Sequence, residues 1–196
     1  MPSPERELSP DERAALLELA RAALRAAFDG RTLHLDPATL PPRLAAPGAA
    51  FVTLERQGEL RGCIGSLERR RPLAQDVCDN VCAAAFRDPR FPPLARPELA
   101  DLDLHLSILG ALEPLPAASE AEALAALAPG VDGLVLEEGF HRATFLPAVW
   151  EKLPEPRQFL AHLKRKAGLP ADHWSRALRL WRYRVDAFGA PFSAPA

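Results

Sequence analysis

The chain has 196 residues, a length that suits one domain with a sizeable hydrophobic core. Apolar residues make up 48% and charged residues 26% of the chain, ordinary values for a globular protein. The net charge of −2 provides no overall basic field, which argues against a nucleic-acid binder. No apolar span reaches the ~20 residues of a membrane helix, and residues 1–7 lack the apolar segment of a signal peptide. We therefore expect a cytoplasmic protein that does not cross a membrane.

The three cysteines have no C-x-x-C spacing, which argues against a disulfide framework and against a zinc site. No phosphate-binding loop, dinucleotide fingerprint or zinc-hydrolase motif is present. The sequence therefore predicts neither a metal site nor a cofactor in this chain.

The first helix is predicted to follow Ser9, with Pro10 in its first turn and Glu12 at the capping-box position. Apolar residues then recur at helical spacing as far as Phe28. Residues 31–50 are rich in proline and small residues, and we predict a connecting loop there.

A hairpin is predicted next, from the apolar run that begins at Phe51 to the hexapeptide Leu60–Gly65. Strand alternation places Arg61 and Cys63 on one face, and a cation beside a thiol favours the reactive thiolate. Cys63 is therefore the predicted catalytic residue. Arg61, Gly62 and Gly65 are predicted to bind a ligand, since the glycines let one approach closely. The alternative is a half-buried structural cysteine, with Arg61 paired to a carboxylate such as Glu55 or Glu68.

A second helix is predicted from Pro72 to near Phe86. Cys78 and Cys82 lie one turn apart on it, and we interpret both as small packing residues. Asp88 and Arg90 follow in a proline-stiffened loop. They are candidate ligand-binding residues, and local hydrogen bonding of the turn is the alternative.

The segment Leu102–Ile108 alternates and predicts a strand with His105 on its polar face, and a short helix is predicted over residues 121–127. A second hairpin over residues 134–145 resembles the first, with Arg142 and Thr144 in the places of Arg61 and Cys63. This echo predicts an internal duplication of a strand-helix-strand unit. If the two copies pack about a pseudo-twofold axis, their guanidinium groups would suit a small anionic ligand. The alternative is that Arg142 balances Glu137 or Glu138 across its own hairpin.

A further helix is predicted from Pro156, and its last turn, Lys164-Arg165-Lys166, is expected to face solvent. One final strand is expected over residues 178–188, and the three tryptophans are expected to be packing anchors. Counting elements predicts an α+β fold, a mostly antiparallel sheet with helices packed on it. We predict a single domain: residues 1–45 as a minor lobe, 46–188 as the main body and 189–196 as a loose tail.

Six blocks of this chain resemble, in order, the signature segments of the AMMECR-type domain. They are Leu60–Gly65, Asp88–Leu94, Pro129–Leu134, Thr144–Pro147, Val149–Glu151 and Lys166–Leu169. The family's bacterial and archaeal members are called AmmeMemoRadiSam system protein A. The resemblance implies a similar repeat and, as partners, a Memo-like protein and a radical S-adenosylmethionine protein. This chain lacks the three-cysteine signature of an iron–sulfur cluster, so any radical chemistry would belong to a partner.

Three functions remain open from the sequence. The first is a system component with a ligand cleft at Leu60–Gly65 that uses Cys63. The second is a non-catalytic adaptor whose loop around Arg90 and Phe91 contacts a partner protein. The third, a nucleic-acid-associated protein, ranks last because the charge balance opposes it. A homodimer is also left open.

Overall fold

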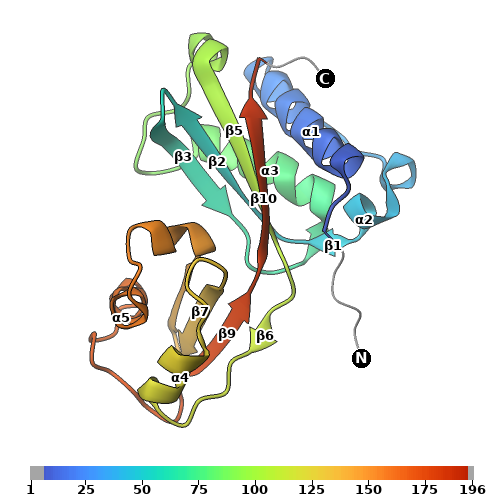
Figure 1. Cartoon of the computed structure of the whole chain (residues 1–196). Coiled ribbons are helices and arrows are strands. Elements are labelled where there is room, and N and C mark those ends of the chain that lie inside the picture. The colour runs from blue at the N-terminus through green and yellow to red at the C-terminus, as the bar shows by residue number, and fades with distance from the viewer. Residues whose placement is uncertain (1–6, 194–196) are drawn as a thin grey trace. The chain divides into compact units, whose positions relative to one another are not determined.

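Two four-stranded sheets with their own helices form the computed structural model, which describes residues 7–193 (Figure 1). The chain divides into two compact units: the first contains residues up to Leu109 and from Asp186 onward, and the second is Gly110–Val185. The division therefore falls after Leu109 and before Asp186, and the single-domain assignment stays a prediction. Helices and antiparallel strands confirm the predicted α+β class.

The first unit is built on the strands β2 (Ala50–Arg56), β3 (Glu59–Gly65), β5 (Leu102–Leu109) and β10 (Val185–Pro191). Their order in the sheet is β10-β5-β2-β3, so β3 is an edge strand. A two-stranded ladder joins β1 (Pro47–Gly48) to β4 (Arg71–Pro72), and a 3-10 helix, η2 (Arg96–Asp101), precedes β5.

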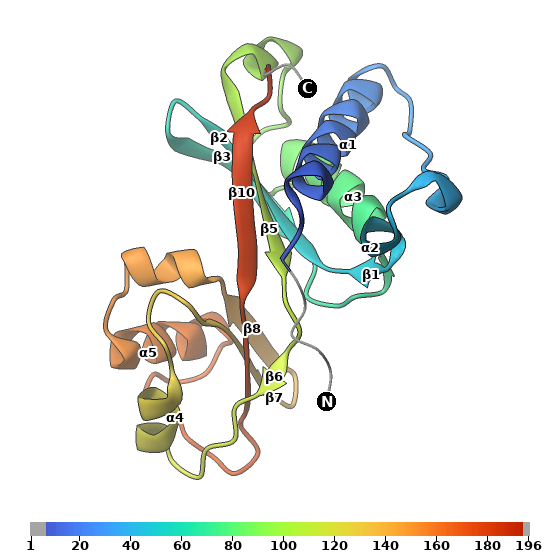
Figure 2. The ribbon, with the colours of Figure 1, turned by 45° about the vertical axis from the view of Figure 1, so that its right-hand side comes forward.

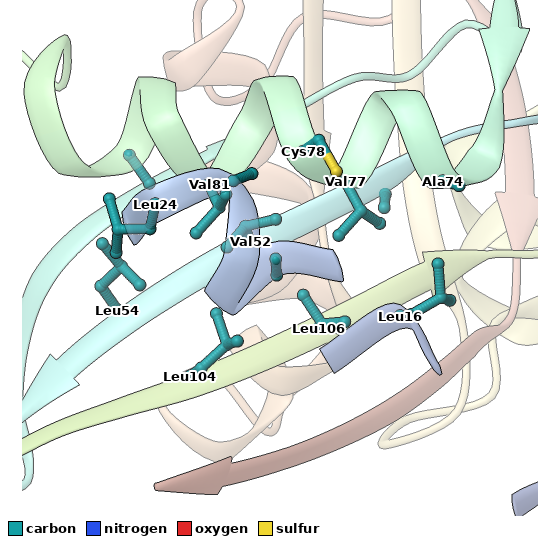
Figure 3. Packing of buried hydrophobic residues seen from close by; sticks show 14 of the residues in the cluster. Leu16, Leu24, Val52, Leu54, Ala74, Val77, Cys78, Val81, Leu104 and Leu106 are labelled. Atoms are coloured by element: carbon teal, nitrogen blue, oxygen red, sulfur yellow. The ribbon is translucent and has the colours of Figure 1, made fainter. Parts of the chain in front are cut away.

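The helices α1 (Pro10–Phe28) and α3 (Leu73–Phe86) lie on the same side of this sheet (Figure 2). The predicted capping box of α1 is confirmed: Ser9 N–H donates to Glu12 Oε2 at 2.8 Å, and Glu12 N–H donates to Ser9 Oγ at 3.2 Å. Branched apolar side chains from both helices and the central strands fill the space between them (Figure 3), including Leu16, Leu24, Val52, Leu54, Val77, Val81, Leu104 and Leu106. Burying each contributes about 1.5–3 kcal/mol.

The second unit is built on the strands β6 (Glu113–Pro114), β7 (Gly133–Glu138), β8 (His141–Phe145) and β9 (Arg179–Tyr183), in the order β6-β9-β7-β8. Its helices are α4 (Glu120–Ala126), η3 (Pro147–Glu151) and α5 (Pro156–Lys166). Trp150 stacks on Phe159 with ring centroids 3.7 Å apart, in a core with Leu134, Leu136, Leu160 and Leu163.

The two hairpins occupy similar places in their sheets. In the first unit β2 lies between its hairpin partner β3 and β5, and in the second β7 lies between its partner β8 and β9. In both hairpins the second strand is the edge strand. This likeness agrees with an internal duplication, which stays a prediction.

Three local predictions are wrong. The expected loop over residues 31–50 contains η1 (Pro37–Thr39), α2 (Pro42–Ala45) and β1, because Asp36 caps the first and Leu44 buries its side chain. The expected final strand is two strands, since β9 pairs in one sheet and β10 in the other. The expected loose tail continues β10, and Phe192 is 3% exposed, with its N–H donating to Leu102 O at 2.7 Å. The last three residues of that tail lie outside the described residues.

No helix among residues 7–193 is long and apolar enough to cross a membrane. Within the same residues, no group of three His, Cys, Asp or Glu side chains is arranged to hold a metal ion. The packing role predicted for Cys78 and Cys82 is confirmed, because both lie in or against the core between α1 and α3.

Candidate functional site

The outer edge of β3 is covered by two side chains of the loop that follows α3. Cys63 N–H donates to Asp88 Oδ2 at 2.9 Å, and the Arg90 guanidinium donates to Cys63 O at 3.2 Å. An edge strand has unpaired backbone groups that would otherwise pair with another strand. Asp88 and Arg90 thus take the place of a neighbouring strand at Cys63. We call residues 88–98 the edge loop.

Asp88 and Arg90 form a bidentate ion pair. Arg90 Nε donates to Asp88 Oδ1 at 2.9 Å and a terminal nitrogen donates to Oδ2 at 2.7 Å. The Asp88 side chain is 1% exposed and that of Arg90 is 53% exposed. The hydrogen bonds from Arg90, and then those from the backbone N–H groups of Cys63 and Arg90, hold the pKa of Asp88 well below its usual range against the effect of burial. The pair thus makes the local hydrogen bond of the turn, from Arg90 N–H to Asp88 Oδ1 at 3.1 Å, and also bonds the backbone of Cys63 on β3.

Arg61 holds the far part of the edge loop. Its guanidinium binds Glu98 through Nε to Oε1 at 2.8 Å and through a second nitrogen to Oε2 at 3.0 Å. It also donates to the carbonyls of Pro92 at 3.0 Å and Pro93 at 3.4 Å. Arg61 pairs with a carboxylate, as the alternative interpretation expected, but the partner is Glu98, 37 residues along the chain, and not Glu55 or Glu68. A register shift opposite Glu55 leaves Arg61 without a cross-strand partner.

The two glycines of the motif make room for the protein's own atoms. A Cβ on Gly62 would lie 2.2 Å from the Ala84 carbonyl oxygen of α3. A Cβ on Gly65 would lie 2.3 Å from the Phe51 ring. Both positions therefore need glycine for packing within the first unit, whether or not a ligand binds nearby.

The Cys63 thiol is half-buried, and Thr53 Oγ1 donates to its Sγ at 3.3 Å. The cation that contacts this residue is Arg90, whose pKa is raised chiefly by Asp88 and also by Cys63. None of the hydrogen bonds within residues 7–193 joins Cys63 to a histidine: His105 faces Glu55, His173 faces Glu138, and His141 bonds the Ala167 carbonyl. The described surroundings of the thiol therefore contain no hydrogen-bonded general base.

Arg142 and Thr144 lie in the second unit. Arg142 Nε is 3.7 Å from Glu137 Oε2, as the alternative interpretation of that arginine expected. Thr144 is buried, with Oγ1 3.0 Å from the Leu134 carbonyl and 2.8 Å from the Tyr183 hydroxyl. Burial raises the pKa of Tyr183 to about 12. Thr144 therefore contributes to the interior of its own sheet.

A buried polar cluster after β3 was not predicted from the sequence. Asp76, with a side chain 1% exposed, accepts from Ala50 N–H at 2.9 Å, Ser66 Oγ at 2.8 Å and Arg71 Nε at 2.9 Å. Asn80, one turn further along α3, donates to the same carboxylate at 2.9 Å. The pattern that could have identified the cluster is the spacing of Asp76 and Asn80, two polar residues four apart beside the apolar stripe of α3.

Lys164 was also placed wrongly. It was expected to face solvent at the end of α5, but its side chain is 0% exposed. Its Nζ lies 3.1 Å from Glu120 Oε1 and donates to the Ala171 carbonyl at 3.2 Å. The turn after α5 folds over the helix end and covers it. Two cavities, of about 380 Å³ and 560 Å³, lie in the second unit, and neither is lined by a residue of the Leu60–Gly65 motif.

An AMMECR1 family model matches residues 17–188, which include the motif, the edge loop and all of the second unit. The chain belongs to the AMMECR1 family. A protein of Methanothermobacter thermautotrophicus is 38% identical over 92% of this chain and 95% of its own length. One from Thermofilum pendens is 34% identical over 92% and 91%. The family resemblance of the six sequence blocks is thereby confirmed.

A solved structure supports the fold. The crystal structure of an uncharacterized protein from Pyrococcus horikoshii is 29% identical, covers 93% of each chain and has a TM-score of 0.86. The similarity therefore spans both units of this chain. The comparisons establish the family and the fold, and the function has to be argued from the site.

Proposed function

We propose that this AMMECR1-family protein is a non-catalytic, partner-binding component of a cytoplasmic system, and that the edge loop is its contact surface. The observation that carries the proposal is that the Arg61 side chain and the Cys63 backbone, in the Leu60–Gly65 motif, bind this loop. Arg61 binds Glu98 and the Pro92 carbonyl, and the Cys63 backbone binds Asp88 and Arg90. Few polar groups of the motif therefore remain to bind or activate a substrate.

The edge loop has the properties of a pre-formed contact surface. Pro92 and Pro93 are exposed, and the Arg90 guanidinium lies over the Phe91 ring at 5.5 Å from its centroid. Arginine and aromatic side chains are enriched among residues that dominate binding energy. A loop fixed by prolines and by two ion pairs loses little conformational entropy when a partner binds. A rigid surface of this kind suits recognition.

The family resemblance suggests the partners. We propose a Memo-like protein and a radical S-adenosylmethionine protein as the molecules that the edge loop contacts. In this arrangement the chemistry belongs to the partner, and the present chain contributes binding. A nucleic-acid partner stays the weakest alternative, because the net charge is −2.

The test uses the purified full chain and each purified partner from the same organism. Phe91→Ala should weaken binding at least tenfold, because it removes an aromatic contact while both residues of each ion pair stay in place, and Arg90 loses only its contact with the ring. Phe140→Ala is the matched control, since Phe140 is fully exposed at the β7–β8 turn of the second unit. Cys63→Ser should leave affinity within about twofold. If Cys63→Ser abolishes binding and Phe91→Ala does not, the proposal is wrong.

A second candidate function, a reactive thiol at Cys63, is favoured by one observation. The Arg90 guanidinium bonds the Cys63 carbonyl and interacts with its side chain, so a cation is present, although it is not Arg61. A small anionic ligand near Arg61, Gly62, Gly65, Asp88 and Arg90 belongs to this second candidate, whereas Arg142 and Thr144 lie in the second unit and would belong to a separate site. Its weakness is that each arginine in that set already has a carboxylate partner.

Alkylation against pH, followed at each cysteine by mass spectrometry, separates the two candidates. Burial raises the pKa of Cys78 to about 12 and also raises that of Cys82, so both are slow internal controls. A reactive thiol predicts that Cys63 alone reacts rapidly at neutral pH and slows in Arg90→Gln. A titration of Cys63 near the ordinary ~8.5 rules out the activated thiol and leaves the adaptor.

A further inference from the structure

A cavity of about 380 Å³ lies in the second unit, between a proline-containing segment and two tryptophans. Its lining includes Pro114 and Pro116 together with Trp174, Leu178 and Trp181. Pro114 lies directly opposite Trp181 in the ladder of β6 and β9. The volume falls within the ~300–1,000 Å³ range of small-molecule sites.

The side chains that line this cavity are donors or apolar. Arg179 lies at the cavity and, within residues 7–193, has no carboxylate within ion-pair distance. The indole N–H groups of Trp174 and Trp181 have no acceptor among the same residues, whereas Trp150 donates to the Asp132 carbonyl. The remaining lining side chains are those of proline, leucine and alanine. A ligand that satisfies this site needs an apolar body and a hydrogen-bond acceptor, preferably an anion.

Trp174 is held in place from several sides. Lys164 Nζ, buried at the end of α5, lies 5.6 Å from the centroid of the Trp174 ring. On either side of Trp174, His173 Nε2 and Ser175 Oγ bond the two oxygens of Glu138 at 2.8 Å and 2.9 Å. His173, followed by Ser175, holds the pKa of Glu138 below its usual range, so the carboxylate stays charged. A half-buried tryptophan fixed in this way is pre-organised for a ligand.

The prolines also limit what can bind. β6 is the edge strand of its sheet, and Pro114 and Pro116 have no N–H to offer an incoming strand. A peptide that adds to the sheet edge is therefore disfavoured, and a small molecule suits this partly open cavity better. We propose that this cavity binds a small organic anion with a planar apolar body, such as an aromatic carboxylate or phosphate, with the body against the tryptophans and prolines and the anion at Arg179. The site is independent of the edge loop, since all of its residues belong to the second unit.

The test is calorimetric titration of the full chain with 2-naphthoate, 2-naphthyl phosphate and the neutral 2-naphthylmethanol. A charge-assisted hydrogen bond contributes enough for about tenfold or tighter binding of an anion than of the alcohol. Arg179→Gln should remove this preference, while Arg176→Gln, an exposed arginine that does not line the cavity, should retain it. Trp181→Leu should weaken all three probes, and its thermal midpoint reports whether it folds. If that variant does not fold, Arg179→Gln decides the matter alone.

Binding of naphthoate but not the phosphate identifies a carboxylate ligand, and the reverse identifies a phosphate ligand. Either result supports an anion site when it depends on Arg179. Three results overturn the proposal: equal affinity for the alcohol and the anions, no heat from any probe at millimolar concentration, or unchanged anion affinity in Arg179→Gln.

Discussion

Replacing Asp88 with asparagine tests whether the edge loop is held as the structure describes. The carboxylate accepts from the backbone N–H groups of Cys63 and Arg90 and from the Arg90 guanidinium. Asparagine keeps the shape but turns an NH₂ group toward one of these donors. Leaving a buried donor unsatisfied costs about 1–3 kcal/mol. Loss of an ion pair with a half-exposed arginine adds up to about 1 kcal/mol. We therefore expect Asp88→Asn to lose about 1–4 kcal/mol at pH 7.

The difference between wild type and Asp88→Asn should depend on pH. The pKa of Asp88 is lowered in the folded state from the ordinary 3.8, so the unfolded chain binds more protons just below that pH. The stabilisation by this carboxylate is fully present above pH 3.8 and declines as the pH falls toward the folded pKa. The gap between the two proteins should narrow by about 1.4 kcal/mol for each pH unit below that value.

The assay is urea unfolding at several pH values, combined with hydrogen exchange of the Cys63 amide. Exchange should accelerate in Asp88→Asn, because the Cys63 N–H loses a charged acceptor. Asp103→Asn, on β5 of the same sheet, is the matched control, since Asp103 makes no ion pair among the described residues. If Asp88→Asn changes the free energy of unfolding by less than about 0.5 kcal/mol and the Cys63 amide stays protected from exchange, the Asp88 carboxylate does not hold the edge loop.

Three further predictions concern single positions. Tyr183 is the only tyrosine, so absorbance near 295 nm should titrate with a midpoint near pH 12, and stability should fall above pH 10 as the unfolded chain ionises; a midpoint near 10 would contradict the burial. Gly62→Ala should lose about 1–3 kcal/mol in urea unfolding, because its Cβ meets the backbone of Ala84, and an unchanged midpoint would refute that approach. Glu120→Gln should lower the free energy of unfolding by about 3 kcal/mol, because it leaves Lys164 buried without its partner, and Lys164→Met should lower it by less. If thermal unfolding finds Lys164→Met the less stable variant, Lys164 is not buried as the structure describes.

Local structure was predicted well because local rules govern it. The capping box of α1, the helix α3 and the strand β5 follow from the residue pattern within each segment, and all three are confirmed. The buried Lys164 was missed because the same pattern does not show that the turn after α5 folds back over it.

Cys63, Asp88 and Arg90 were predicted as candidate site residues, but the hydrogen bonds that join them were not predicted. Cys63, Asp88 and Arg90 do come together, 25 and 27 residues apart in sequence. The partner of Arg61 was predicted wrongly, since spacing cannot show which of many carboxylates a distant loop delivers. The cation at Cys63 is therefore a different arginine from the one that strand alternation suggested.

The sequence by itself determined the family, the α+β class, and the position of the helices and hairpins, because periodicity and turn chemistry act over a few residues. The tertiary structure alone decided what those residues do. Gly62 and Gly65 are packing positions because other parts of the first unit approach them closely. Arg61 binds Glu98, and a cavity is lined by residues about sixty apart in sequence, Pro114 and Trp174. The physical reason is that long-range contacts depend on how helices and sheets pack, which no local pattern encodes.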